Sequence, residues 1–324
     1  MSPGRPRALV LRAIGLGDHL AGVPALKALR RALPDHELVL AAPAPLAPLV
    51  ALVPAVDTHL PVAELAPVPW TGPPPDVAVD LHGNGPASRR LLEDLGPGRL
   101  VAYETADGPR WDPEEHERAR WCRLVRTAFA LLPTEADPDD VSLDAPPAAP
   151  QVAGAVVVHP GAAYPGRRWP PVRFAQVTRA LAAEGHRVVV TGSAAEAPLA
   201  EEVRRAAGLP AEAVLAGRTD LGGLAALVAA ARLVVCGDTG TAHLASAYAT
   251  PSVLLFGPTP PHRWGPPARG PHTVLWHGTG PGDPHATELD PALAAIGVEE
   301  VLEACRVRLS RAGSARRPST APSG

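Results

Sequence analysis

The chain has 324 residues, of which 46% are hydrophobic, and a formal net charge of −3 at pH 7. This length can bury a substantial core in one or two domains, and the composition is that of an ordinary soluble globular protein rather than a disordered chain or a strongly basic nucleic-acid binder. Aromatic residues make up only 4%, too few for a stacking platform for single-stranded nucleic acid, so we expect no nucleic-acid partner.

Strand-like and helix-like runs alternate along the sequence, which is typical of an α/β fold with parallel sheets. In the first half we predict strands over 8–12, 37–42 and 76–82 and helices over 18–33 and around 114–132. The rhythm restarts in the second half, with strands over 155–159, 187–192, 233–237 and 252–257 and helices over 171–185, 196–207, 221–231, 240–249 and 290–309. Two halves of comparable size are therefore predicted, with a cleft between them.

The segment 134–154 is rich in Pro, Ala and acidic residues, as an exposed interdomain linker would be. We therefore divide the chain into an N-terminal domain over 1–150, a C-terminal domain over 151–310 and a disordered tail over 311–324. The acidic run DPDD (137–140) is interpreted as solvated charge. Ligands of open parallel sheets bind beyond the carboxyl ends of the strands, so functional residues are expected in the loops that follow them.

The loop GDTGTAHLASA (237–247) follows one predicted strand and opens a helix. Asp238 and Thr239 are placed to cap that helix, Gly240 allows a close backbone approach, and Thr241 and His243 project from its first turn. Because a helix N-terminus presents free N–H groups and a partial positive charge, the loop could bind an anion. A plain cap with a half-buried histidine would explain the pattern equally well.

Two further loops of the second half carry charge. In HPGAAYPGRRWPPVRF (159–174), Arg167 and Arg168 suit a diphosphate, although a solvated loop residue is the favoured interpretation for Arg168, and Trp169 would then pack on the sheet. In TGSAAE (191–196), Glu196 could accept hydrogen bonds from both ribose hydroxyls, or could simply stabilise a helix N-terminus. The apolar loop FGPTPPHRWGP (256–266) is a weak signal for a base or sugar pocket.

In the first half, ALVLRAIGLGDHLAG (8–22) joins an apolar run to a helix through Gly15 and Gly17. Asp18 follows directly, and its negative charge would repel a phosphate bound at this turn. The turn is therefore better suited to position a carboxylate than to bind a phosphate. The loop DLHGNGPASRR (80–90) follows another strand. In WDPEEHERARWCR (111–123), acids and bases fall three and four residues apart, which predicts an exposed helix face laced with ion pairs.

The cysteines do not suggest a metal site or a disulfide framework, because Cys122, Cys236 and Cys305 are far apart and form no CxxC pair. A reducing cytoplasm is the expected compartment. The N-terminal apolar run is interrupted by charges, unlike a signal peptide. The longest apolar stretch, 224–236, is too short to span a bilayer, so no transmembrane segment is expected. No basic amphipathic helix favours a membrane-surface acceptor, and peripheral membrane contact stays open.

Taken together, these loops resemble glycosyltransferase family 9, the family of ADP-heptose:lipopolysaccharide heptosyltransferases and their relatives. The resemblance covers about residues 7–265 and rests on RAIGLGD (12–18), DLHGN (80–84), HPG…RRWPP (159–171), GSAAE (192–196), GDTGTAHLASA (237–247) and FGPTPP (256–261). It implies a GT-B fold, two Rossmann-like domains with parallel sheets facing a central cleft, and inverting sugar transfer without a metal or other cofactor.

The resemblance also implies roles for single residues. Asp18 matches the general base that acts on the acceptor hydroxyl, and acceptor-side candidates are Gly17, His82 and Asn84. The implied donor-binding residues are Arg167 for the diphosphate, Glu196 for the ribose, and Asp238, Thr239, Gly240, Thr241 and His243 in the nucleotide-sugar loop. The chain departs from the family at Ile14 and Gly15, where Ser or Thr is common, and at His19, where an apolar residue is usual.

We therefore expect a cytoplasmic glycosyltransferase that moves a heptose-like sugar from a nucleoside diphosphate, with ADP the expected nucleotide, to a glycan or small-molecule acceptor, as in lipopolysaccharide core biosynthesis. Three other functions stay open. A nicotinamide-dependent oxidoreductase would need G-x-G-x-x-G, but Leu20 occupies the third glycine position. A non-hydrolysing sugar-nucleotide epimerase could share the architecture, and a non-catalytic sugar-nucleotide-binding relative would have no need of Asp18 as a base.

Overall fold

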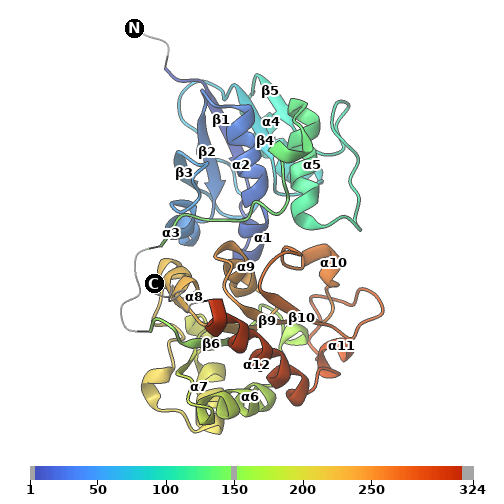
Figure 1. The fold of residues 1–324 in the computed structure, drawn as a ribbon. Coiled ribbons are helices and arrows are strands. Elements are labelled where there is room, and N and C mark those ends of the chain that lie inside the picture. The colour runs from blue at the N-terminus through green and yellow to red at the C-terminus, as the bar shows by residue number, and fades with distance from the viewer. Residues whose placement is uncertain (1–3, 147–151, 316–324) are drawn as a thin grey trace, which may run out of the picture. The chain divides into compact units, whose positions relative to one another are not determined.

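A computed structural model describes residues 4–146 and 152–315, which form two compact units, each built on one parallel sheet (Figure 1). Of the described residues, one unit comprises 4–146 together with His262–Trp264, and the other comprises 152–261 and 265–315. The predicted α/β fold with two parallel sheets is confirmed. Of the predicted tail, 311–315 continue the last helix and 316–324 lie outside the described residues.

The first unit has a five-stranded sheet in the order β3-β2-β1-β4-β5. Its strands are β1 (Arg7–Leu11), β2 (Glu37–Ala42), β3 (Thr58–Pro61), β4 (Val77–Asp80) and β5 (Arg99–Val101), all parallel to their neighbours. Its helices are α1 (Leu16–Ala21), α2 (Val23–Ala32), α3 (Ala47–Val50), α4 (Pro86–Glu93) and α5 (Glu117–Phe129), and the four-residue α10 (Pro261–Trp264) lies mostly in this unit. Short 3₁₀ turns span Ala44–Leu46 and Pro133–Glu135.

The second unit also has a five-stranded parallel sheet, in the order β10-β9-β8-β6-β7. Its strands are β6 (Val156–His159), β7 (Val188–Val190), β8 (Leu233–Gly237), β9 (Ser252–Leu255) and β10 (His272–Leu275). Its helices are α6 (Pro171–Ala183), α7 (Ala197–Ala207), α8 (Leu221–Ala230), α9 (Gly240–Ala247), α11 (Pro291–Ala294) and α12 (Val298–Ala315), with 3₁₀ turns at Pro165–Arg167, Ala194–Glu196 and Ala211–Ala213.

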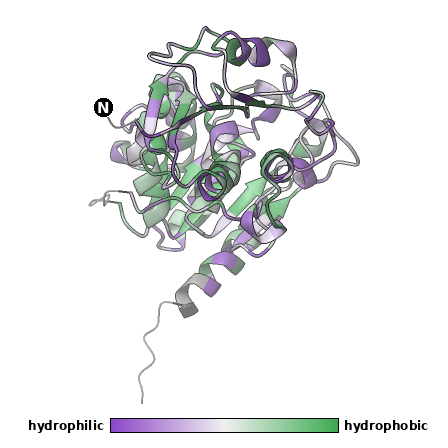
Figure 2. Ribbon diagram, turned by 90° about the horizontal axis from the view of Figure 1, so that it is seen from above, coloured by the Kyte–Doolittle hydropathy of each residue, from purple (hydrophilic) through white to green (hydrophobic). Residues whose placement is uncertain are grey.

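The central strands form because their apolar runs are buried on both faces, as parallel sheets require. Residues 8–11 of β1 and 156–158 of β6 are at most 1% exposed, and the strands are coloured mainly as hydrophobic in Figure 2. Trp169 packs in the core of the second unit, edge-on to Phe174, and its Nε1 donates to the Ile296 carbonyl at 3.1 Å. The expected packing of Trp169 is therefore confirmed.

Several elements differ from the sequence predictions. β3 and β5 lie at the edges of the first sheet and β10 at an edge of the second, where side chains stay partly exposed and leave no long apolar run. The predicted helix 18–33 begins at Leu16 and breaks at Gly22 into α1 and α2. The predicted helix 290–309 is likewise divided into α11 and α12.

The predicted linker is partly wrong, because residues 134–146 belong to the first unit. The Asp140 carboxylate forms ion pairs with Lys27 at 2.7 Å and with Arg31 at 2.5 Å. Partial burial would raise the pKa of Asp140, but these ion pairs outweigh it, and the pKa is lowered. Asp139 pairs with Arg118 at 3.1 Å. Asp140 thus anchors the run to α2, which corrects the prediction at that residue, whereas Asp137 and Asp139 are exposed.

Each sheet has one point where the strand order reverses, and this is where open α/β sheets bind ligands. In the first sheet the reversal lies between β1 and β4, and in the second between β6 and β8. The loops after those four strands are the ones that carry Asp18, His82, Arg167 and Asp238. No helix within 4–146 or 152–315 is long and apolar enough to cross a membrane.

Candidate active site

Asp18 lies in α1, the short helix that follows β1, and its side chain is half-buried. The helix has Gly15 as its N-cap residue, with an ordinary φ of −64°, so the turn does not depend on a left-handed glycine. A Cβ on Gly15 would lie 3.5 Å from Oδ2 of Asp18, which places the carboxylate against the turn. Gly17 is a residue of the same helix.

The neighbouring loop after β4 holds His82 and Asn84. The buried carboxylate of Asp80 accepts hydrogen bonds from the His82 amide at 2.9 Å and from Ser88 Oγ at 2.7 Å, and burial raises its pKa. His82 is half-buried, burial lowers its pKa, and Nδ1 has no hydrogen-bond partner among the described residues. Asn84 is exposed. The first reversal point thus presents a carboxylate, an imidazole and an amide.

The run 111–123 does not form the exposed face that its spacing predicts. Glu117, Arg118 and Arg120 of α5 are each at most 6% exposed. Oε1 of Glu117 accepts from Trp121 Nε1 at 2.6 Å, its Oε2 accepts from Arg120, and the Arg120 guanidinium lies 4.1 Å from the Trp111 ring centroid. Burial of Glu117 and Arg120 is tolerated because the two charges neutralise each other and because the Arg120 guanidinium stacks on the Trp111 ring.

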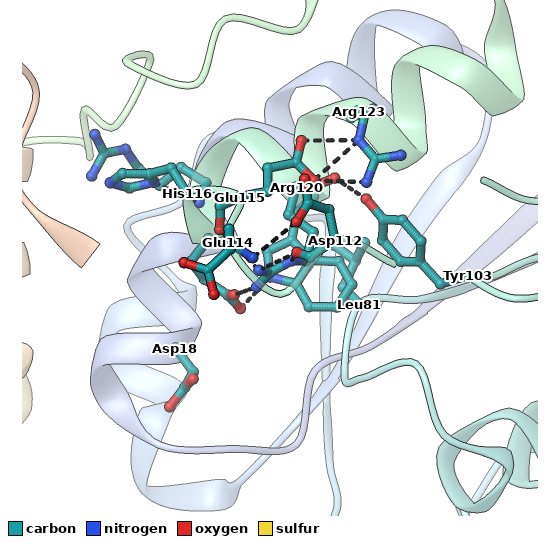
Figure 3. A network of polar contacts seen from close by, with 12 residues as sticks. Asp18, Leu81, Tyr103, Asp112, Glu114, Glu115, His116, Arg120 and Arg123 are labelled. Atoms are coloured by element: carbon teal, nitrogen blue, oxygen red, sulfur yellow. Dashed lines mark hydrogen bonds and ion pairs between the residues drawn. The ribbon is translucent and has the colours of Figure 1, made fainter. Parts of the chain in front are cut away.

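Arg12, directly after β1, joins this buried cluster. It is 0% exposed, and its Nη2 lies 3.5 Å from Oε1 of Glu117. Its Nε donates to the Asp18 carbonyl at 2.6 Å and its Nη1 donates to the Leu81 carbonyl. Figure 3 shows Asp18 on its helix below the polar network, with Leu81 and Arg120 labelled. Sequence reasoning did not single out Arg12, and it placed Glu117 on an exposed helix face. The signal for Arg12 was its position directly after the apolar run 8–11, where a buried arginine needs an acidic partner.

His19 is fully buried, and neither ring nitrogen has a hydrogen-bond partner among the described residues. Burial, together with the nearby charge of Arg12, lowers its pKa to about 3, so the ring is neutral at physiological pH. It therefore occupies an apolar position as an uncharged side chain.

The free energy of unfolding of a His19→Leu variant is expected to decrease less at acidic pH than that of the native chain. Below pH 6.5 the unfolded chain binds a proton on His19 and the folded chain does not, so native stability falls with pH until about pH 3. The native free energy of unfolding should therefore drop relative to the variant by about 2 kcal/mol between pH 7 and pH 5. Urea unfolding at both pH values measures this. The exposed His285→Leu is the control, and equal pH dependence of His19→Leu and the native chain would contradict the assignment.

In the second unit, Arg167 and Asp238 contact each other. Nη2 of Arg167 donates to the Asp238 carboxylate at 3.0 Å and to its carbonyl at 2.5 Å. Asp238 is 7% exposed, whereas the Arg167 side chain keeps 24% of its surface exposed. Arg168, favoured as a solvated loop residue, is half-buried and donates from Nε to the Ala162 carbonyl at 2.9 Å. The Arg167 guanidinium is thus held by Asp238, while part of the side chain stays accessible to a ligand.

The helix α9 begins directly after this pair. Thr239 is its N-cap residue but its side chain accepts no capping hydrogen bond, and Asp238 pairs with Arg167. The expected capping by Thr239 is therefore wrong. Thr241 and His243 are buried, at 1% and 8% exposed, while Gly240 opens the helix. The Ala242 amide donates to the Thr239 carbonyl at 3.0 Å, so the helix N-terminus that could attract an anion is formed by the amides of Gly240 and Thr241.

Glu196 closes a short 3₁₀ turn before α7. Its Oε2 accepts from the Ser193 amide at 2.8 Å and from Ser193 Oγ at 2.9 Å. Burial would raise the pKa of Glu196, but these bonds and the nearby His159 outweigh it, and the pKa is lowered. The second role predicted for Glu196, stabilisation of a helix N-terminus, is therefore observed. A Cβ on Gly161 would lie 2.1 Å from Oε1 of Glu196, so the second oxygen occupies space that only glycine leaves.

His159 ends β6 beside Glu196. Its Nδ1 lies 3.0 Å from Thr191 Oγ1, and burial lowers its pKa. Sequence reasoning did not single it out, although its position at the reversal point was a signal. Over 4–146 and 152–315, no group of at least three His, Cys, Asp or Glu residues is arranged to hold a metal ion.

Part of the chain is similar in sequence to known proteins. Residues 109–285 match the family model for glycosyltransferase family 9 (heptosyltransferase). Lipooligosaccharide heptosyltransferase 2 of Haemophilus influenzae is 37% identical over 122 residues, which are 36% of this chain and 34% of that protein. The aligned part therefore spans about a third of this relative's length.

Solved structures extend the likeness to nearly the whole chain. The structure of E. coli ADP-heptose lps heptosyltransferase II has a TM-score of 0.77 and 24% identity, covering 94% of this chain and 99% of that one. The iron-containing dodecameric glycosyltransferase TibC of enterotoxigenic E. coli has a TM-score of 0.62 and 16% identity, covering 95% and 76%. At these identities the likeness establishes the fold.

Proposed function

The chain belongs to glycosyltransferase family 9, and on that basis we propose that it transfers a heptose-like sugar from ADP to a hydroxyl of a glycan or small-molecule acceptor, with inversion. The observation that carries the proposal is that the two reversal points hold complementary chemistry. The first presents the Asp18 carboxylate, and the second presents the Arg167 guanidinium beside the N-terminus of α9. A base and an anion site are the two parts that this reaction needs.

In the proposed reaction the acceptor oxygen attacks the anomeric carbon as Asp18 accepts the hydroxyl proton. The bond between that carbon and the diphosphate oxygen breaks, and the electron pair leaves with ADP. Arg167 and the first N–H groups of α9 stabilise the charge that grows on the diphosphate. Asp238 holds the Arg167 guanidinium in place. A positioned base supplies about 10²–10⁴-fold and each well-placed charge-stabilising group about 3 kcal/mol.

On the donor side we propose that Glu196 accepts hydrogen bonds from the ribose hydroxyls, because Ser193 already fixes one end of its carboxylate. Thr239, Gly240, Thr241 and His243 complete the donor site. On the acceptor side we propose Gly17, His82 and Asn84. The domain roles follow from these residues: the N-terminal domain binds the acceptor and the C-terminal domain binds the donor. We place the protein in the cytoplasm, with any membrane contact peripheral.

Incubation with ADP-heptose tests the proposal. ADP release should require an acceptor, such as lipopolysaccharide lacking the heptose, and the product should carry the sugar with inverted anomeric configuration. Release of nucleotide without a glycosylated acceptor would favour an epimerase, and stabilisation by the donor without turnover would favour a non-catalytic relative.

We propose that no metal is needed, so activity should survive EDTA. Loss of activity that iron restores would instead match the neighbour named as iron-containing.

A Gly161→Ala variant should weaken donor binding while keeping the fold. The new methyl group meets the end of the flexible Glu196 side chain, which can swing away. We expect the Kd for ADP to rise about tenfold, the loss of about one charge-assisted hydrogen bond, as measured by calorimetry. Gly280→Ala is the matched control, since a Cβ there meets nothing within 4 Å. An unchanged Kd for Gly161→Ala would argue against a ribose contact by Glu196.

A further inference from the structure

Arg12 ties together three segments of the first unit. Its Nε donates to the carbonyl of Asp18 in α1, its Nη1 to the carbonyl of Leu81 after β4, and its Nη2 pairs with Glu117 of α5. The guanidinium thus uses all three nitrogens inside the protein. Since the residue is 0% exposed, it is not available to touch a substrate.

Gly22 provides the space that Arg12 occupies. A Cβ at this position would lie 2.6 Å from both Cδ and Nε of Arg12, and 3.2 Å from the His19 carbonyl oxygen. The backbone of Gly22 is helical, with φ −81° and ψ −15°, a conformation that alanine adopts without strain. The glycine is therefore required by the arginine and not by its own dihedral angles.

The contact with Asp18 falls at the end of α1, a helix of six residues. The last carbonyls of a helix have no partner inside it. The Asp18 carbonyl accepts from the Gly22 amide at 3.1 Å and from Arg12 Nε at 2.6 Å. The residue that bears the proposed base is therefore the one whose backbone Arg12 holds.

Glu117 fixes Arg12 in turn. Its carboxylate receives Arg12, Arg120 and the Trp121 indole, and the Arg12 guanidinium lies 5.0 Å from the Trp121 ring centroid. A residue held by ion pairs and by stacking has few rotamers left to explore. Through Glu117 and Arg12, α5 thereby restrains the position of α1.

We propose that Arg12 is a positioning residue for the transfer reaction: lodged against Gly22 and held by Glu117, it fixes the backbone of Asp18 so that the carboxylate meets the acceptor hydroxyl. This inference rests on the proposed function, because it takes Asp18 as the base. A displacement of about 1 Å in a reacting group can lower a rate by about 10²-fold.

Gly22→Ala tests the proposal without removing any functional group. The methyl group displaces Arg12, so kcat should fall about 10²-fold while the KM for ADP-heptose stays within about twofold. Gly297→Ala is the matched control, because a Cβ there meets nothing within 4 Å, and its kcat should equal that of the native chain. A native kcat in Gly22→Ala overturns the proposal.

A double-mutant cycle separates positioning from a general structural role. If Arg12 acts through the Asp18 base, Gly22→Ala should have little further effect on the residual rate of Asp18→Asn. If the variant merely damages the fold, its cost should be the same in both backgrounds, and that result overturns the proposal.

Hydrogen exchange of residues 16–22 provides a measurement that needs no substrate. Gly22→Ala should raise exchange there by about tenfold or more, the loss of about 1.4 kcal/mol of local stability, and leave the strands unchanged. Unchanged exchange overturns the proposal even if kcat falls. If the native chain transfers no sugar, the proposed function fails, and exchange alone then decides whether Arg12 holds α1.

Discussion

An Asp18→Asn variant is expected to lose sugar transfer almost completely while it still binds the donor. Asparagine has the same shape but cannot accept the acceptor proton, so kcat should fall by about 10²–10⁴-fold, the range of a positioned general base. The Asp18 carbonyl that Arg12 holds is unaffected, so α1 should stay in place. The Kd for ADP should be unchanged, because the proposed diphosphate contacts come from Arg167 and α9.

Single-turnover kinetics and calorimetry with ADP measure the two effects separately. Asp94→Asn makes the same change at an exposed position at the end of α4 and should behave as the native chain does. If Asp18→Asn keeps native turnover, the base has been assigned to the wrong residue. If it loses donor binding as well, Asp18 contacts the donor and the division of roles is wrong.

A Glu117→Ala variant is expected to lower the free energy of unfolding of the first unit. Burial lowers the pKa of Arg12, and the charge of Glu117 is the first of the interactions that oppose that shift. Without Glu117, two buried guanidinium groups, Arg12 and Arg120, lose their common carboxylate, and the Trp121 indole loses its acceptor. Removing one partner of a buried ion pair typically costs about 3–5 kcal/mol. We expect a loss of that size in the unfolding of the first unit.

Urea unfolding followed by tryptophan fluorescence should detect this loss, because Trp121 lies in the cluster. The two units need not unfold together, so each transition is fitted separately. Glu201→Ala is the control, since Glu201 pairs with Arg204 and Arg205 on the exposed surface of α7, where ion pairs contribute little. A change below about 1 kcal/mol in Glu117→Ala would show that the cluster is not a stabilising unit.

The sequence allowed the central strands and their loops to be predicted, because buried parallel strands are continuous apolar runs followed by polar residues. β1, β2, β6 and β8 lie where these runs predict them. Edge strands were not predictable in this way: β3 and β10 have partly exposed side chains and no run to mark them. The same loops contained Asp18, Arg167 and Asp238, but their partners could not be inferred.

Partners were missed where a contact joins distant parts of the chain. Arg12 and Glu117 are 105 positions apart, and Arg167 and Asp238 are 71 apart. Local spacing favoured pairs within one helix, and for Glu117 and Arg120 that pair does exist. What spacing could not predict is that this pair is buried, since burial depends on which helix covers which strand end.

Lys27, the only lysine of the chain, gives this protein an unusual chemical handle. Its side chain is 11% exposed and its Nζ is bonded to Asp140 and Ser142, which tie the 137–144 segment to α2. Apart from the α-amino group, an amine-reactive reagent therefore has a single target, and that target is shielded for as long as the segment stays docked. Acylation of Lys27, followed over time by mass spectrometry, would report the opening of that one junction without any introduced label site.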